Sequence, residues 1–151
     1  MSLPVPDSTA LPEPELAPEL YEGVPLRRLL AFLADMVLIV VLSALVVPFT
    51  AFTGIFFFPA LVAVVGFIYR VATITAGSAT WGMRLAGLEL RDGAGRRFDF
   101  GMAFLHTALF TVFISFMLPQ IVSLVLHVST PRRQGLHDLI LGTAALRLPM
   151  A

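Results

Sequence analysis

The stretch LLAFLADMVLIVVLSALVVPF, from Leu29 to Phe49, decides the fold of this protein. Its only polar members are Asp35 and Ser43. At about 1.5 Å per residue, a helix of this length reaches roughly 30 Å, which is the thickness of the hydrocarbon core of a bilayer. A second apolar run follows and carries one charge, Arg70, near its end. We therefore predict two transmembrane helices, with spans of about 27–49 and 55–74.

The composition agrees with a membrane protein. Hydrophobic residues make up 58% of the 151 residues, charged residues make up 13%, and the mean hydropathy is +0.89. A soluble domain of this size needs more charge to cover its surface, so we expect the lipid bilayer to be the main surrounding. The formal net charge is zero, which gives no reason to expect a nucleic-acid partner.

A third apolar run, with a span of about 103–128, is interrupted by Leu118-Pro119-Gln120. The proline has two interpretations. It either kinks one spanning helix, which neighbouring helices can tolerate, or it marks the point where the segment doubles back as a helical hairpin. The sequence leaves both open.

The segment between the second and third runs is rich in glycine and arginine. The turn sequence Asp92-Gly93-Ala94-Gly95 lies between residues 85–91 and 96–100, which predicts a small β-hairpin at the membrane surface. We expect residues 1–24 to form a disordered, acidic, proline-rich tail ahead of a transmembrane domain over residues 25–148. The predicted fold class is thus an all-α membrane protein with one small cytoplasmic β-hairpin.

The distribution of arginine predicts the orientation, because cytoplasmic loops carry an excess of basic residues. Two arginines, Arg27 and Arg28, flank the N-terminal end of the first span, none lies between the first two spans, five lie from Arg70 to Arg97, and three lie in the C-terminal tail. The N-terminus and the hairpin are therefore predicted to be cytoplasmic. If the third run folds back, the tail is cytoplasmic too and could add a strand at 143–148 to the hairpin; if it crosses once, the tail lies outside.

Asp35 is the most informative residue, because a carboxylate inside a membrane span costs about 2.5–3.5 kcal/mol. It lies about two helical turns, roughly 10 Å, from Arg28 on the same helix face, too far for direct contact. A further polar group beside it is therefore implied. The interpretations are a structural clamp, an ion or proton pathway, and a contact with a partner. The candidates for the further group are Arg27, Arg70, His106, Arg132 and Asp138.

Three segments, in this order along the chain, resemble motifs of the RDD family of small bacterial membrane proteins. They are RLLAFLAD at 28–35, TWGMRLAGL at 80–88 and RRQGLHDLILGT at 132–143. The resemblance implies that Arg28, Asp35 and Asp138 are the three residues that give the family its name. It also implies a charge network at the cytoplasmic rim, with Arg70, His106, Arg132 and His137 as auxiliary members. The family is described as functionally obscure, with ligand transport suggested.

Two functions fit these observations. The first is a non-catalytic accessory or assembly subunit of the bacterial cytoplasmic membrane that packs against a larger membrane complex. The alternative is a small homo-oligomeric transporter or cation/proton exchanger that uses Asp35. We expect no enzyme activity and no cofactor: the chain has no cysteine, and His106, His127 and His137 lack metal-like spacing.

Overall fold

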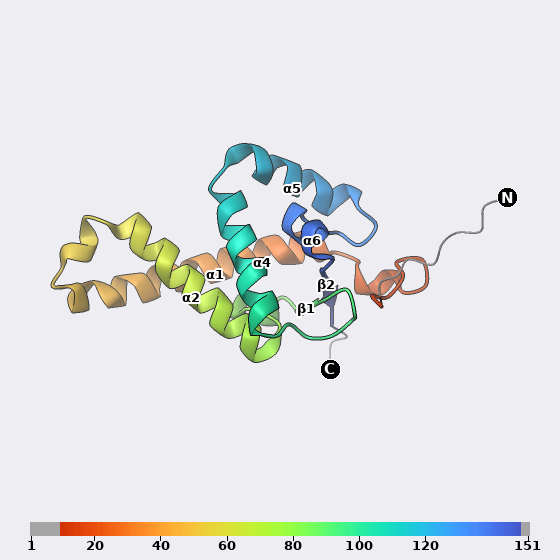
Figure 1. Ribbon diagram of the computed structural model, residues 1–151, viewed down its shortest axis with the longest axis horizontal. Helices are drawn as coiled ribbons and strands as arrows, with labels where there is room; N and C mark the ends of the chain where they lie inside the picture. Colours follow the sequence, from red (N-terminus) through yellow and green to blue (C-terminus); the bar gives the residue numbers. More distant parts are fainter. Residues whose placement is uncertain (1–9, 149–151) are drawn as a thin grey trace.

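The computed structural model describes residues 10–148 and is mostly helical (Figure 1). Two long helices come first, followed by a short helix, a strand, three further helices and a last strand. The helices are α1 (Val24–Val46), α2 (Phe58–Gly77), α3 (Trp81–Leu85), α4 (Phe100–Ile114), α5 (Met117–Ser129) and α6 (Leu136–Leu141). The strands are β1 (Leu88–Arg91) and β2 (Ala144–Arg147), and three short 3₁₀ turns are η1 (Pro18–Leu20), η2 (Val47–Thr50) and η3 (Thr53–Ile55).

Helices α1 and α2 form a long hairpin and correspond to the first two predicted spans. Both are long and apolar enough to cross a membrane. Each begins with a proline in its first turn, Pro25 or Pro59, where the missing N–H would have no partner within the helix in any case. The boundaries differ from the prediction by about three residues. The 3₁₀ turns η2 and η3, with Pro48 in the first of them, connect the two helices.

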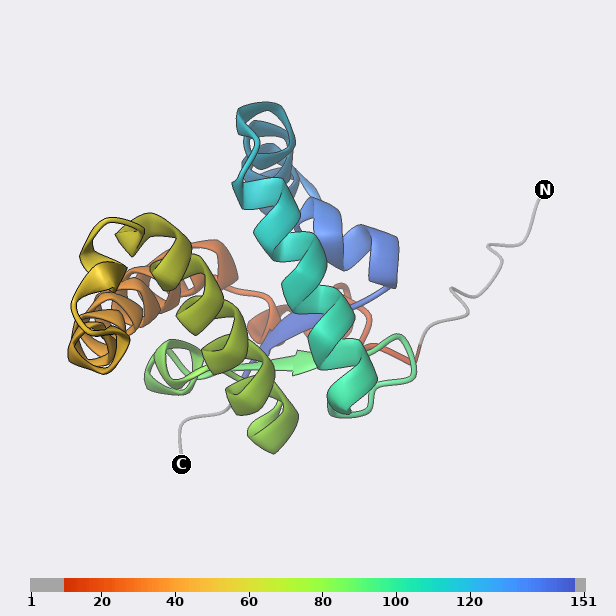
Figure 2. The same ribbon diagram turned by 60° about the vertical axis from the view of Figure 1, so that its left-hand side comes forward.

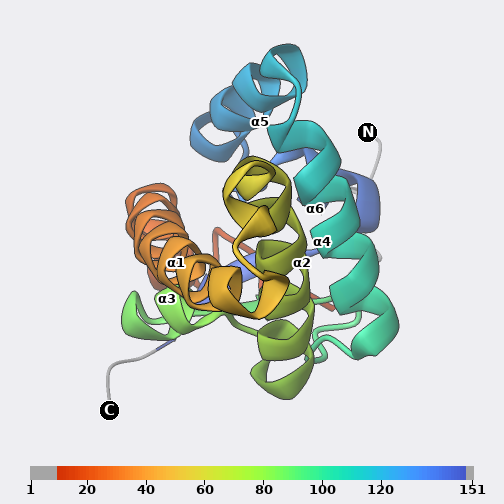
Figure 3. The same ribbon diagram turned by 90° about the vertical axis from the view of Figure 1, so that its left-hand side faces the viewer.

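The third apolar run is two helices rather than one. Helices α4 and α5 meet at Ser115 and Phe116 with a bend of 115°. Phe116 has extended backbone angles, whereas Pro119 lies in the first turn of α5, where a proline is tolerated. The break therefore precedes the proline, and the chain turns back instead of continuing as a kinked helix (Figure 3).

The sheet is not the predicted local hairpin. Strand β1 pairs antiparallel with β2, from Leu88 opposite Arg147 to Arg91 opposite Ala144. The turn at Asp92 forms, because its carboxylate accepts from the backbone N–H groups of residues 94 and 96, but residues 96–99 do not continue as a strand. Beside β1, Ser78 instead bonds to Leu90 through its backbone carbonyl and its hydroxyl. The further prediction that residues 143–148 add a strand to this segment is confirmed (Figure 2).

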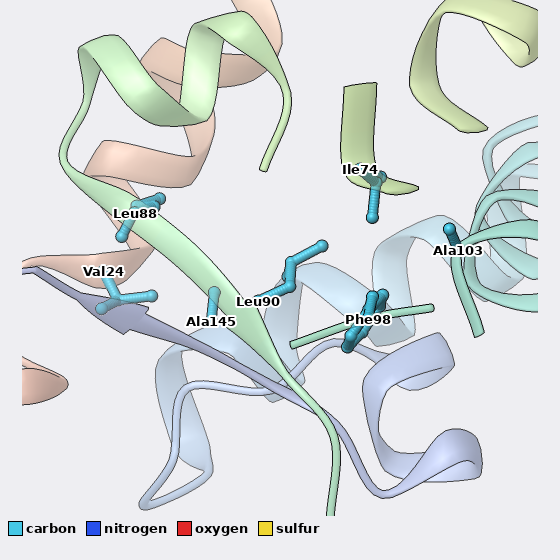
Figure 4. Packing of buried hydrophobic residues seen from close by; sticks show 7 residues of the cluster. All are labelled: Val24, Ile74, Leu88, Leu90, Phe98, Ala103 and Ala145. Atoms are coloured by element: carbon cyan, nitrogen blue, oxygen red, sulfur yellow. The ribbon is translucent and has the colours of Figure 1, made fainter. Parts of the chain in front are cut away.

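The apolar core lies at the sheet end of the molecule. Side chains from α1, α2, β1, β2, α4 and the segment just before α4 meet there: Val24, Ile74, Leu88, Leu90, Phe98, Ala103 and Ala145 (Figure 4). Away from this core, many large apolar side chains of α1, α2, α4 and α5 are exposed. Helices with an exposed apolar surface of this extent suit a lipid surrounding rather than water.

The N-terminal segment packs against the last strand, contrary to the predicted disordered tail. Leu11 and Tyr21 are buried together with Ala144 and Leu146 of β2. The Tyr21 hydroxyl donates to the Pro12 carbonyl, and the N–H of Ala10 donates to Gly93. Residues 10–24 are therefore part of the folded domain. The rest of the predicted tail, residues 1–9, lies outside the described residues.

Candidate functional site

Asp35 lies on the inner face of α1 and is buried, with 1% of its surface exposed. Its carboxylate accepts three hydrogen bonds, from the Tyr69 hydroxyl at 2.7 Å, the Thr80 hydroxyl at 2.6 Å and the Gly82 N–H at 2.8 Å. The Arg70 guanidinium lies 3.9 Å from the carboxylate, beyond hydrogen-bond distance. The further polar group that the sequence implied beside Asp35 is thus mainly made of neutral donors.

Two of these donors, Thr80 and Gly82, come from the motif that follows α2, and Tyr69 lies in α2 itself. Thr80 caps helix α3 by accepting from the N–H of Met83, and its hydroxyl hydrogen is then free to donate to Asp35. Gly82 brings the backbone of α3 against α1 so closely that an added Cβ would lie 2.2 Å from the Ala31 carbonyl oxygen. A glycine is therefore required here. Asp35, Thr80 and Gly82 together fix α3 on α1.

Asp138 forms a second, fully buried cluster at the start of α6. Its carboxylate accepts from the Arg28 guanidinium, from His106 Nε2 at 3.0 Å, from the Thr143 hydroxyl at 3.1 Å and from the Gly135 N–H at 3.0 Å. Burial alone would raise the pKa of Asp138, but Arg28 and the neighbouring hydrogen bonds outweigh burial and hold that pKa well below its usual range.

Three histidines surround the pair of Arg28 and Asp138. His127 Nδ1 contacts the Ser123 carbonyl at 2.7 Å, so this nitrogen carries the hydrogen and Nε2 accepts from Arg28. The His137 ring packs 4.6 Å from that of His106, and its Nε2 lies 3.7 Å from Asp138. Burial lowers the pKa of His137 to about 3, so it is neutral at physiological pH.

The predicted site residues thus fall into two clusters. Arg28, Asp138, His106 and His137 come together in one, and Asp35 and Arg70 lie in the other. The remaining candidates point elsewhere: Arg27 donates to the Ala86 carbonyl, and Arg132 lies beside Tyr21.

Sequence reasoning missed six members of these clusters: Tyr69, Thr80, Gly82, His127, Gly135 and Thr143. The Thr-Trp-Gly sequence after α2 was visible as a motif, but nothing in it indicated Asp35 as the partner.

The second cluster also contains three groups that could ligate a metal. One ligand atom from each of His106, His137 and Asp138 lies within 4.8 Å of the others, a grouping that their sequence spacing did not indicate. However, the Asp138 oxygens already accept from four donors, one of them a guanidinium. A cation placed there would face the positive charge of Arg28, so the cluster suits the guanidinium better than a metal ion.

A cavity of about 510 Å³ lies between α1, α2, α4 and α5 and joins the two clusters. Its polar lining is Arg28, Asp35, Arg70, His106, Thr107, Gln120, His127 and His137. The Arg70 guanidinium lies over the ring of Phe110, 4.6 Å from the ring centre, and 5.9 Å from that of Phe32. The cavity is therefore lined by both charged and apolar side chains.

The hydroxyl groups of α4 divide between the helix and the cavity. Thr111 and Ser115 donate to carbonyls one turn earlier in their own helix, as expected for such residues in apolar helices. The Thr107 hydroxyl is buried and has no hydrogen-bond partner among residues 10–148. Of these three hydroxyl groups, that of Thr107 is thus the one left unused, on a residue that lines the cavity.

The sequence model of the RDD family matches residues 23–142, which is most of the chain. The matched range includes Arg28, Asp35 and Asp138, and both clusters lie almost entirely within it. The chain therefore belongs to the RDD family. Searches of curated proteins and of solved structures gave no match.

Proposed function

We propose that this member of the RDD family is a small membrane transporter that works as a homo-oligomer, with the cavity between α1, α2, α4 and α5 as its solute site. The observation that supports this most is the cavity itself, whose volume of about 510 Å³ lies within the range of small-molecule pockets. Ionisable residues inside a membrane are costly and usually mark a pathway or a ligand site. A subunit that only packs against a larger complex has no need of such a cavity.

The topology that fits this proposal places the N-terminus, the sheet and the C-terminal strand on the cytoplasmic side. The pairing of β1 with β2 supports it, because the segment after α2 and the end of the chain then share one side. Helix α4 has 15 residues and reaches about 22 Å, less than the roughly 30 Å of the hydrocarbon core. We therefore propose that α4 and α5 enter the bilayer and return, and that all ten arginines except Arg70 lie at the cytoplasmic end.

Within this proposal Asp35 is a structural clamp and not the group that couples transport to a cation or proton. Its carboxylate already accepts three hydrogen bonds that hold α2 and α3 on α1. Protonation would weaken these bonds and loosen the helix packing. The same saturation of Asp35 and Asp138 supports the proposal that the chain is not an enzyme, since neither carboxylate is free to act as a general base.

The test uses the absence of cysteine in the natural sequence. Single cysteines would be placed in the cavity lining, Met83→Cys near the sheet and Ile114→Cys near the far end of α4. A membrane-impermeant thiol reagent would then be applied to right-side-out and to inside-out vesicles. A transporter exposes its solute site to both sides in turn, so we expect reaction from both sides.

Controls come from exposed positions at the two ends, Leu16→Cys and Thr53→Cys, each of which should react from one side only. If the cavity cysteines also react from one side only, transport through this cavity is wrong. Purification in mild detergent adds a second criterion. A partner protein present in constant stoichiometry, in place of copies of this chain alone, would favour the accessory subunit.

A further inference from the structure

We infer that the cavity binds an amphipathic anion, a single carboxylate or phosphate head on an apolar chain, with the head held by Arg70, the Nε of Arg28 and the Thr107 hydroxyl. The inference rests on the proposed function in one respect, since it names the chemical class of the solute for the same cavity. The argument has three steps: the donors, the carboxylates and the apolar lining.

The first step is the state of Arg70. Arg70 is 9% exposed, and its guanidinium lies 3.9 Å from the nearest carboxylate oxygen, which belongs to Asp35. The guanidinium makes no hydrogen bond within residues 10–148. Phe32 and Phe110 flank it on two helices. A guanidinium carries five N–H donors, and leaving them unused in a buried site is costly. A carboxylate or phosphate would accept from two of them at once.

Two further donors line the same cavity, one on α1 and one on α4. Arg28 is four residues before Phe32 on α1, and Thr107 is three residues before Phe110 on α4, so each lies about one helical turn from the ring that contacts Arg70. Both helices run away from the sheet, which places Arg28 and Thr107 on the sheet side of Arg70. The Nε of Arg28 and the hydroxyl of Thr107 are buried without a partner in the described part of the chain.

The second step is that the carboxylates of the site are already used. Asp35 accepts three hydrogen bonds and Asp138 accepts four, while both ring nitrogens of His127 are engaged. The charged groups with unused hydrogen-bonding capacity in the cavity are therefore cationic, the guanidinium of Arg70 and the Nε of Arg28. A ligand that pairs with these cationic groups accepts hydrogen bonds and carries negative charge, whereas a metal ion or an organic cation would face two guanidinium groups and find both carboxylates already bonded.

The third step concerns the rest of the lining, which is apolar. Leu29, Phe32, Phe110, Ile114, Leu124 and Val128 line the same cavity. Leu29, Leu124 and Val128 are more than half exposed on the outer surface of the helices, where the bilayer would lie. A chain of methylene groups can therefore extend from the head along these residues towards the lipid, and each buried methylene contributes about 0.8 kcal/mol.

The test measures binding to the full chain, purified in a neutral detergent. The probes are dodecyl phosphate, dodecanol with the same chain and no charge, and inorganic phosphate with the head alone. We expect dodecyl phosphate to bind and to raise the melting temperature, with much weaker effects from the other two. Arg70→Gln should weaken the binding by about 10- to 100-fold, because it removes hydrogen bonds to a charged group.

Two variants keep the test clear of folding effects. Thr107→Val has nearly the volume of threonine and should weaken binding by about tenfold. Arg84→Gln is the matched control, because Arg84 stacks on Trp81 outside the cavity, and it should bind like the natural chain. The melting temperature of each variant without ligand shows whether it is folded.

Dodecanol or inorganic phosphate binding as tightly as dodecyl phosphate would overturn the inference, as would unchanged binding in Arg70→Gln. The outcome is separable from that of the cysteine experiment. Reaction from both sides without binding of dodecyl phosphate would refute this ligand class alone. Binding with reaction from one side only would refute transport and leave a ligand site.

Discussion

Replacing Gly82 with alanine should separate α3 from α1. Gly82 lies in a helix, so alanine can adopt its backbone conformation, and only the available space is limiting. The new Cβ would lie 2.2 Å from the Ala31 carbonyl oxygen and 2.8 Å from a carboxylate oxygen of Asp35, whereas real Cβ contacts begin near 3.0 Å. Helix α3 would have to retreat by about 0.8 Å to restore that contact.

Such a shift stretches the hydrogen bond from the Gly82 N–H to Asp35, now 2.8 Å long. A hydrogen bond to a charged group contributes about 1.5–3 kcal/mol, and the overpacked contact adds about 1–3 kcal/mol. We therefore expect Gly82→Ala to lower the free energy of unfolding by about 3–5 kcal/mol. A lower melting temperature in mild detergent, followed by the exposed Trp81, would report this loss.

The matched control is Gly101→Ala in the first turn of α4, where the added Cβ would lie 3.6 Å from its nearest neighbour, an ordinary contact. This variant should be neutral or slightly more stable, because alanine favours helix by about 0.5–1 kcal/mol relative to glycine. Equal melting temperatures for the two variants would refute the close approach of α3 to α1 and the role of Asp35 as a clamp.

Three further predictions concern the second cluster and the topology. Asp138→Ala should lower the free energy of unfolding by about 3–5 kcal/mol, because it leaves a buried guanidinium unpaired, whereas the surface cap variant Asp99→Ala should lower the melting temperature far less. The pKa of His137 is about 3 in the fold and near 6.5 when unfolded, so the unfolded chain binds more protons between these values and stability should fall as the pH drops below 6.5. Melting curves between pH 7.5 and 4 should show a shallower decline in His137→Gln, and an unchanged slope would contradict the assignment. Leu148→Cys should react with an impermeant thiol reagent from the cytoplasmic side and Thr53→Cys from the other; reaction of both from the same side would exclude the proposed topology.

Local features of the chain made the membrane helices predictable. A run such as residues 29–49 is helical and apolar in any tertiary setting, because its backbone groups have no partners in lipid except each other. The same reasoning selected Asp35, since a carboxylate in such a run is too costly to be incidental. The boundaries of α1 and α2 differ from the predicted spans by a few residues, because Pro25 and Pro59 fit the first turn of a helix.

Contacts between distant segments were not predictable in the same way. The prediction of a β-hairpin was wrong, because a turn sequence at residues 92–95 specifies a chain reversal but not which strand will pair with β1. That choice depends on α4–α6 returning the chain to the sheet. The partners of Asp35 lie 34–47 residues away in sequence, and the contact between Arg28 and His127 spans 99 residues.

The sequence by itself therefore determined that the chain suits a membrane, where its first two spans lie to within a few residues, and that Asp35 matters, because hydropathy and the cost of a charge are properties of single segments. Only the tertiary structure decided that the Asp35 carboxylate has three hydrogen-bond donors while the Arg70 guanidinium has no acceptor within hydrogen-bond distance. This depends on which side chains and backbone groups of distant segments are brought beside each charge. The bend between α4 and α5 also belongs to the tertiary structure, since it encloses the cavity on which the proposed ligand depends.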